Sequence, residues 1–133
     1  MAALTYEQAV EAFTKSAWQG PVAGVNLLKF RQEAQYPDDS FEPCTGLEAW
    51  LKYEELALKL AVKYNLKPLF RGMVDQTFFG AHDEEWDALI INGYDEKQDL
   101  IAALADDELN ALGVHVGAAI EKYTFLACRP DSL

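Results

Sequence analysis

The sequence is short of the residues that mark several large classes of protein. It holds two cysteines, Cys44 and Cys128, which lie far apart and form no CxxC pair. A disulfide framework is therefore not expected, and a reducing cytoplasm is the expected compartment. The histidines His82 and His115 and these cysteines do not form a spaced ligand set, so we expect no metal site and no bound cofactor.

Long apolar runs and basic residues are also scarce. No run approaches the about 20 apolar residues of a membrane helix, and the first residues lack the basic start and apolar core of a signal peptide. Eleven Lys and Arg residues face 22 Asp and Glu residues, which gives a net charge of −11. Such a surface repels phosphate backbones and anionic bilayers, so neither nucleic acid nor membrane is an expected partner.

What is present fits one globular domain. Half of the 133 residues are hydrophobic and 12% are aromatic, which is enough for one core. We expect a single domain over 1–133, with an N-terminal helix within 1–20 and a core over 21–129. The capping box of Thr5 and Gln8 predicts the start of that helix, and Gly20-Pro21 predicts its end.

The pattern of the remaining chain predicts an α+β fold. Strands are expected at 22–30, 67–79 (with Gly72 as a bulge), 86–94 and 123–128. A long helix is expected at 47–65, a short one after the box of Asp95 and Gln98, and another from Asp106 to Ile120. Without the leading helix this order is β-α-β-β-α-β, the ferredoxin-like plan with a four-stranded antiparallel sheet. The polar stretch 31–46 reads as a long loop, either a lid or a dimer arm.

The expected strands are apolar on both faces. Ala88 and Ile90 alternate with Leu89 and Ile91, and Val22–Phe30 is apolar on both parities. One face packs on helices, and water cannot be the partner of the other. A second copy of the chain can cover it, so we expect a homodimer that buries on the order of 1,500 Å² or more.

Two polar residues stand out in apolar surroundings. His115 lies on the last helix beside the small residues Ala111 and Ala118, which leave space next to the imidazole. It could act as a general acid or base, anchor a ligand, or simply be hydrogen-bonded where helix meets sheet. Asn26 interrupts an apolar strand, and its buried amide could hold a ligand or tie neighbouring backbone.

Arg71 and Tyr53 are further candidates for a ligand site. A guanidinium in mid-strand must face solvent, pair with a carboxylate such as Glu54, or face a cavity that takes an anion. Tyr53 shares a face of the long helix with Tyr64, which indicates packing in the core, at an interface or against a ligand.

Five segments, in order, resemble domain-of-unknown-function family 1330. They are Asn26–Arg31 (NLLKFR), Gly46–Tyr53 (GLEAWLKY), Phe70–Gly72 (FRG), Glu84–Asp87 (EEWD) and Asp106–His115 (DDELNALGVH). The resemblance covers residues 21–127 and implies membership of the dimeric α+β barrel superfamily, which has the ferredoxin-like plan. It also implies a cavity beside Asn26, Arg71, Trp86 and His115, under the long loop.

The family pattern implies no particular reaction, and this chain departs from it. Family members tend to have Arg after the helical histidine, where this chain has Val116. We expect a protein that binds a small acidic or carbonyl-bearing molecule, with His115 as catalytic residue and Asn26, Arg71, Trp86 and Tyr53 as ligand-binding residues. A structural or regulatory homodimer without catalysis is one alternative. A cofactor-free or haem-type monooxygenase or isomerase is another, and a haem enzyme would need an axial histidine that faces an open cavity.

Overall fold

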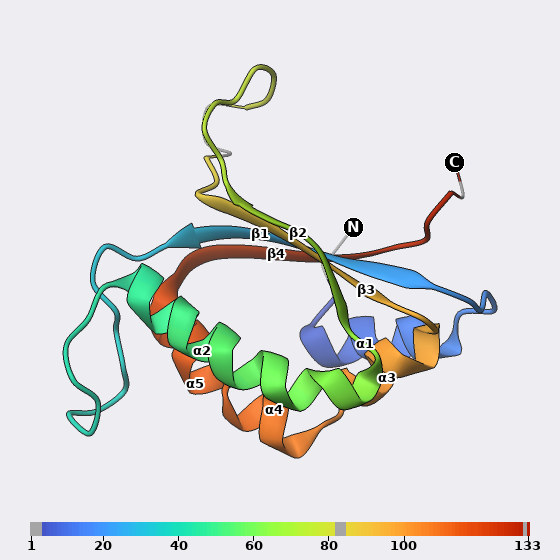
Figure 1. The fold of residues 1–133 in the computed structure, drawn as a ribbon, viewed down its shortest axis with the longest axis horizontal. Helices are drawn as coiled ribbons and strands as arrows, with labels where there is room; N and C mark the ends of the chain where they lie inside the picture. Colours follow the sequence, from blue (N-terminus) through green and yellow to red (C-terminus); the bar gives the residue numbers. More distant parts are fainter. Residues whose placement is uncertain (1–3, 82–84, 132) are drawn as a thin grey trace.

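The computed structural model describes residues 4–81, 85–131 and 133, and is built on one antiparallel sheet with helices on one face (Figure 1). The order across the sheet is β2-β3-β1-β4, so β1 and β3 are central. This arrangement confirms the predicted ferredoxin-like α+β fold. The strands are β1 (Val22–Phe30), β2 (Lys67–Met73), β3 (Ala88–Tyr94) and β4 (Ile120–Cys128).

Capping boxes fix the starts of the first two helices. The N–H of Gln8 donates to Thr5 Oγ1 at 3.1 Å and the N–H of Thr5 donates to Gln8 Oε1 at 3.0 Å, as predicted. Thr45 and Glu48 form the same pair before the long helix. No helix of the described residues is long and apolar enough to cross a bilayer. The helices are α1 (Tyr6–Lys15), α2 (Gly46–Ala61), the 3₁₀ turn η1 (Val62–Tyr64), α3 (Lys97–Leu104), α4 (Asp107–Ala111) and α5 (Gly113–Ala119).

The second strand is shorter than the predicted 67–79. Its ladder ends where Met73 pairs with Ala88, because β3 begins there and the chain beyond Met73 has no partner strand. Residues 74–79 instead form an arm that projects past the sheet (Figure 1), with Phe78 85% and Phe79 97% exposed. The register shifts between Pro68 and Phe70 and not at the predicted Gly72. Residues 80–85, which separate the predicted strands at 67–79 and 86–94, lie partly outside the described residues.

Three further boundaries differ from prediction. The long helix ends in η1, because Asn65 adopts a left-handed conformation with φ 59°. Glu96, and not Asp95, caps α3: its N–H donates to Asp99 Oδ2 at 3.1 Å. The helix predicted from Asp106 to Ile120 is two helices, broken at Leu112, and β4 begins directly at Ile120.

The long loop is fastened to the body of the protein. The N–H of Arg31 donates to the carbonyl of Ala119 at 2.8 Å, and the N–H of Gln35 donates to that of Ala118 at 2.9 Å. Within the loop, the N–H of Ala34 donates to the carbonyl of Cys44 at 2.9 Å. The loop therefore runs beside the end of α5.

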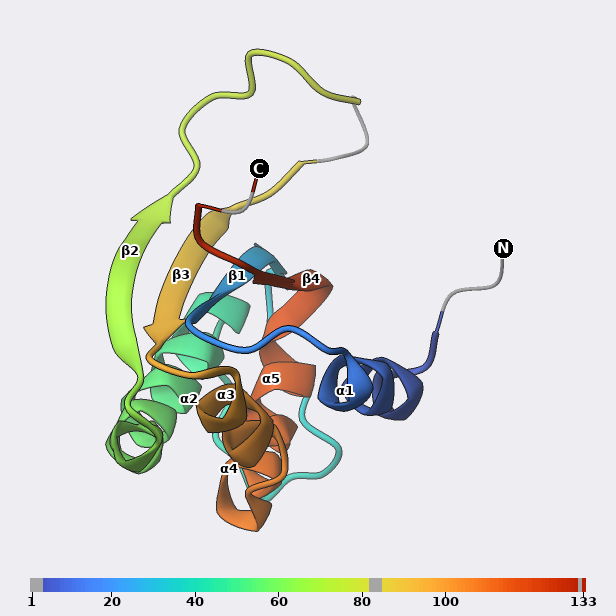
Figure 2. The same cartoon turned by 90° about the vertical axis from the view of Figure 1, so that its right-hand side faces the viewer.

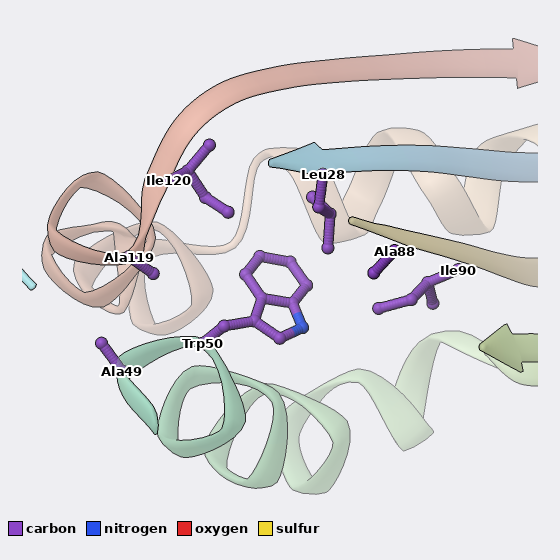
Figure 3. Close-up of a cluster of buried hydrophobic side chains, with 7 residues drawn as sticks. All are labelled: Leu28, Ala49, Trp50, Ala88, Ile90, Ala119 and Ile120. Carbon is purple, nitrogen blue, oxygen red and sulfur yellow. The ribbon is translucent and has the colours of Figure 1, made fainter. Parts of the chain in front are cut away.

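The core lies where α2 meets the sheet. The indole of Trp50 projects from α2 toward Leu28 on β1 and Ile90 on β3 (Figure 3). Ala49 and Ala119 let the helices α2 and α5 approach each other closely. Leu28, Ala49 and Ala119 are fully buried. This cluster holds one end of the helix layer against the sheet.

The two faces of the sheet have different surroundings. On β1, Val22, Gly24, Asn26 and Leu28 face the helices and are buried. All helices lie on that side (Figures 1 and 2), and the opposite face is not covered in the monomer. Apolar side chains occupy that opposite face as well, among them Val25, Leu27, Leu89, Ile91 and the exposed Leu69 and Leu126.

Candidate functional site: a cavity between sheet and helices

A cavity of about 740 Å³ lies between the helix layer and the sheet. A volume of this size is typical of a site for a small organic molecule. Most of its lining is apolar or aromatic, with contributions from α1, α2, α3, β1, β2, β3 and β4. Its polar lining residues are Tyr6, Asn26, Tyr53, Glu54, Arg71, Asn92, Tyr94, Asn110 and Tyr123.

Helix α1 forms one wall of the cavity without belonging to the core. Tyr6, Ala9, Val10 and Phe13 line the cavity, yet no residue of α1 is buried. An amphipathic helix normally buries its apolar stripe against protein. Here the stripe faces the cavity.

The C-terminal end of α1 is held by Lys97, which is 0% exposed. Its ammonium group donates to the carbonyl and hydroxyl oxygens of Ser16, both at 2.7 Å, and to the carbonyl of Trp18 at 3.3 Å. The same nitrogen lies 5.1 Å from the ring centre of Phe13 and 5.2 Å from that of Trp18. These contacts attach α1 to α3 at one end of the helix.

Asn26 is at the centre of a short hydrogen-bond chain on the floor of the cavity. Its Nδ2 donates to the carbonyl of Ile90 at 3.1 Å, and its Oδ1 accepts from the hydroxyl of Tyr123 at 2.6 Å. The amide therefore ties β1 to β3 and positions Tyr123. The sequence left two roles open for Asn26, holding a ligand or tying neighbouring backbone. Asn26 bonds the backbone and also lines the cavity, so the structure is compatible with both.

Four tyrosines from four elements share the cavity: Tyr6, Tyr53, Tyr94 and Tyr123. Burial raises the pKa of Tyr94 to about 12, with a further contribution from Tyr53. Burial also raises the pKa of Tyr6, Tyr53 and Tyr123. The phenols consequently stay protonated and act as hydrogen-bond donors at neutral pH.

Arg71 pairs with Glu54, one of the alternatives that the sequence left open. Arg71 Nε and Nη2 each lie 2.8 Å from Glu54 Oε1. The carboxylate raises the pKa of the guanidinium, first through the hydrogen bond and then through its charge. Both residues line the cavity. The guanidinium is therefore neutralised by its neighbour on α2.

Trp50 carries a buried polar atom with no partner among the described residues. Its Nε1 makes no hydrogen bond there, although Trp50 is only 5% exposed. The nitrogen lies on the edge of the indole that faces Ile90, another lining residue (Figure 3). A buried donor without an acceptor costs about 1–3 kcal/mol. The core therefore contains one hydrogen-bond donor, Trp50 Nε1, that has no acceptor among the described residues.

His115 is not among the residues that line the cavity. The hydroxyl of Tyr36 lies 2.7 Å from His115 Nδ1, and the ring of Phe41 stacks on that of Tyr36 with centres 4.2 Å apart. The imidazole meets both rings edge-on. His115 therefore faces the long loop, whose two aromatic rings pack against the imidazole, while Gly113 and Val116 of the same helix line the cavity.

Burial lowers the pKa of His115, and Lys52 lowers it further. The hydrogen bond between His115 Nδ1 and the Tyr36 hydroxyl, whose direction depends on the tautomer of the imidazole, fastens the loop to α5. Trp86 is also absent from the cavity lining; its ring lies 4.5 Å below the ammonium of Lys122. Among the described residues, no group of three or more His, Cys, Asp or Glu side chains is placed to hold a metal ion.

The structure thus brings Asn26, Tyr53 and Arg71 together in one cavity and leaves His115 and Trp86 outside its lining. Sequence reasoning missed Tyr6 and Tyr123 as site residues. For Tyr123 a signal was present, since it shares a parity with Phe125 on the helix-facing side of β4. For Tyr6 none was, because the placement of α1 depends on long-range contacts.

Comparisons with solved structures agree on the fold. The protein RPA0582 of Rhodopseudomonas palustris, described as a protein of unknown function, has a TM-score of 0.85 and 25% identity in its methylated form, over 96% of this chain and 93% of that chain. A dimeric protein of unknown function with a ferredoxin-like fold from Bacteroides fragilis has a TM-score of 0.54 and 16% identity, over 82% and 95%.

A DABB family protein with a ferredoxin-like fold from Mesorhizobium loti has a TM-score of 0.51 and 8% identity, over 84% of this chain and 97% of that chain. No family model matches the sequence, and no curated protein matches it. The chain therefore has the ferredoxin-like α+β fold described for the proteins from Bacteroides fragilis and Mesorhizobium loti, and RPA0582 resembles it over nearly the whole length.

Proposed function

We propose that this protein binds a small organic molecule in the cavity between its sheet and its helices, as a homodimer of the dimeric α+β barrel type. The observation that carries the proposal is the cavity of about 740 Å³, which is lined by aromatic side chains and by hydroxyl and amide groups. The resemblance to family 1330 and the dimeric neighbour from Bacteroides fragilis support the assembly.

Binding is favoured over catalysis by the position of His115. The group expected to act as acid or base is fastened to Tyr36 at 2.7 Å and does not line the cavity. The same position gives no support to a haem enzyme that uses His115 as axial ligand. The polar groups that remain in the cavity are hydrogen-bond donors and acceptors that can orient a ligand.

Ligand binding can be tested by filling the cavity. Ala57 lines it from α2, and Ala9 lines it from α1. We expect small organic acids, lactones or ketones that raise the melting temperature of the native protein to lose this effect in Ala57→Trp and in Ala9→Trp. Ala102→Trp places the same indole on the exposed face of α3, outside the cavity, and should keep the effect.

Thermal shifts from a compound panel, checked by calorimetry, provide the measurement. The melting temperature of each variant without ligand shows whether it folds, and Ala9→Trp guards against misfolding of Ala57→Trp because α1 is not part of the core. Ligand responses that survive both cavity variants would contradict the proposal.

A further inference from the structure

We propose that the ligand of this cavity is uncharged and carries carbonyl oxygen on an apolar ring system, an inference that rests on the proposed function. The sequence alone left an acid and a carbonyl compound equally open. The charges and the unpaired donors of the described cavity residues separate these two classes.

The charged residues of the cavity and the net charge of the protein disfavour an acidic ligand. Among the described lining residues, Glu54 and Arg71 are the charged ones, and they pair at 2.8 Å. The Arg71 side chain is 56% and the Glu54 side chain 15% exposed, and the charge of Glu54 offsets much of the attraction that Arg71 would offer to a ligand carboxylate. The net charge of −11 adds a long-range repulsion against any anion. An uncharged ligand meets neither obstacle.

The unpaired polar groups favour a ligand with hydrogen-bond acceptors. Tyr53 and Tyr94 line the cavity, and their hydroxyls make no hydrogen bond to any described residue. Burial raises the pKa of both, so each keeps the proton that it can donate. The hydroxyl of Tyr123 already donates to Asn26. Tyr53 and Tyr94, with the exposed Tyr6 and the amide of Asn92, thus offer donors to a ligand.

The walls of the cavity add carbon surface for a ligand. The indole N–H of Trp50 has no accessible surface in the cavity, so it is not counted among these donors although it has no partner among the described residues. The rest of the wall is mostly apolar and aromatic, which stabilises a ring system by burial and by stacking. A ketone or a lactone on an aromatic ring offers acceptors to the donors and carbon surface to the walls.

Three probes of similar shape test the inference on the full-length protein: methyl naphthyl ketone, naphthoate and ethylnaphthalene. Titration calorimetry should show the ketone binding about tenfold more tightly than the hydrocarbon, since one or two hydrogen bonds are gained. Naphthoate should bind at least about tenfold more weakly than the ketone, because its charge is desolvated in the cavity beside an Arg71 that Glu54 already neutralises.

Two variants test which hydroxyl groups give the ketone its tighter binding. In the double variant Tyr53→Phe, Tyr94→Phe the ketone should lose its advantage of about tenfold, while ethylnaphthalene binds as before. Tyr64→Phe is the matched control: its hydroxyl donates to Asp106, it is not a lining residue, and the advantage of the ketone should persist.

The outcomes separate the two proposals. If naphthoate binds as tightly as the ketone, or if the ketone binds no better than ethylnaphthalene, the ligand class is overturned and the cavity remains a binding site. If none of the probes binds at millimolar concentration, or if binding is unchanged in Ala57→Trp, the proposed function is overturned and the ligand class with it.

Discussion

Single polar residues in this protein do one of two things: they fasten a segment, or they line the cavity. Lys97 and His115 are both almost fully buried, and both fasten a neighbouring segment, the end of α1 in one case and the long loop in the other. Asn26 does both, because it bonds the backbone of β3 and holds the hydroxyl of Tyr123 in the cavity.

The imidazole of His115 should make the stability of the protein depend on pH. Its pKa in the folded protein lies below the ordinary 6.5, so below pH 6.5 the unfolded chain binds more protons at this site. The contribution of the neutral imidazole to the unfolding free energy is complete above pH 6.5. It is lost as the pH falls from 6.5 through the pKa of His115 in the folded protein. Urea unfolding of the native protein and of His115→Asn, at about pH 7.5 and about pH 5.5, measures it.

We expect the loss of unfolding free energy between these pH values to be smaller in His115→Asn, since an amide does not titrate. Tyr36→Phe serves as control, because it removes the hydroxyl partner and keeps the titrating imidazole. An equal loss in the native protein and in His115→Asn would contradict the assignment.

At the residue scale, the sequence predicts which side chains are unusual better than it predicts what they do. Asn26 and Arg71 are recognisable as polar groups in apolar strands, and both line the cavity. The partner of His115 is Tyr36, 79 positions away in a loop without periodic pattern. No local pattern predicts that contact, so the space beside the imidazole looks empty in the sequence.

Among the elements, the start of α2 has the tightest packing. A Cβ on Gly46 would lie 2.2 Å from the carbonyl oxygen of Arg31 and 2.6 Å from that of Ala119. Both atoms belong to the backbone and cannot move aside alone. Gly46 therefore allows the junction of β1, α2 and α5 to close, and its N–H donates to the carbonyl of Arg31 at 3.1 Å.

Gly46→Ala should lower the unfolding free energy by more than about 2 kcal/mol, because backbone must shift to admit the methyl group. Gly117→Ala is the matched control, since Gly117 lies within α5 with no atom within 4 Å of its Cβ position. There the same methyl group should stabilise the helix by about 0.5–1 kcal/mol. Urea unfolding measures both; equal effects would refute the assigned role of Gly46.

The elements were predicted well where the signal is local. The capping box of Thr5 predicted the start of α1, and the apolar run Val22–Phe30 predicted β1, whose burial alternates from Val22 to Leu28. The end of β2 was not predictable from 67–79, since apolar residues recur in that stretch as far as Phe78 and Phe79, beyond the polar Asp75–Thr77. It ends at Met73 because β3 begins at Ala88, which is a property of the pair and not of either segment.

For the whole molecule, the face of the sheet away from the helices is the surface through which we propose that the chain dimerises. Val25, Leu27, Leu89 and Ile91 are half-buried there and have no helix above them (Figure 2). A patch of this kind marks an interaction surface. A second copy of the sheet is the expected cover.

Ile91→Lys should convert the dimer to a monomer, because a charge at the centre of the face would be buried without a partner. Sedimentation velocity over a range of protein concentrations measures the change. Val62→Lys is the control, on η1 in the helix layer and 70% exposed, and should leave the dimer intact. A native protein that sediments as a monomer, or an Ile91→Lys variant that remains a dimer, would contradict the assembly.

The loose attachment of α1 has a consequence for how this protein changes over evolution. Most positions that shape a ligand site also support a core, so substitutions there are limited by folding. The cavity-facing residues of α1, such as Ala9 and Val10, are outside the core, and the helix is anchored at its far end by Lys97. Substitutions along α1 should therefore reshape the cavity at little cost in stability, which makes this helix the wall of the cavity that folding constrains least.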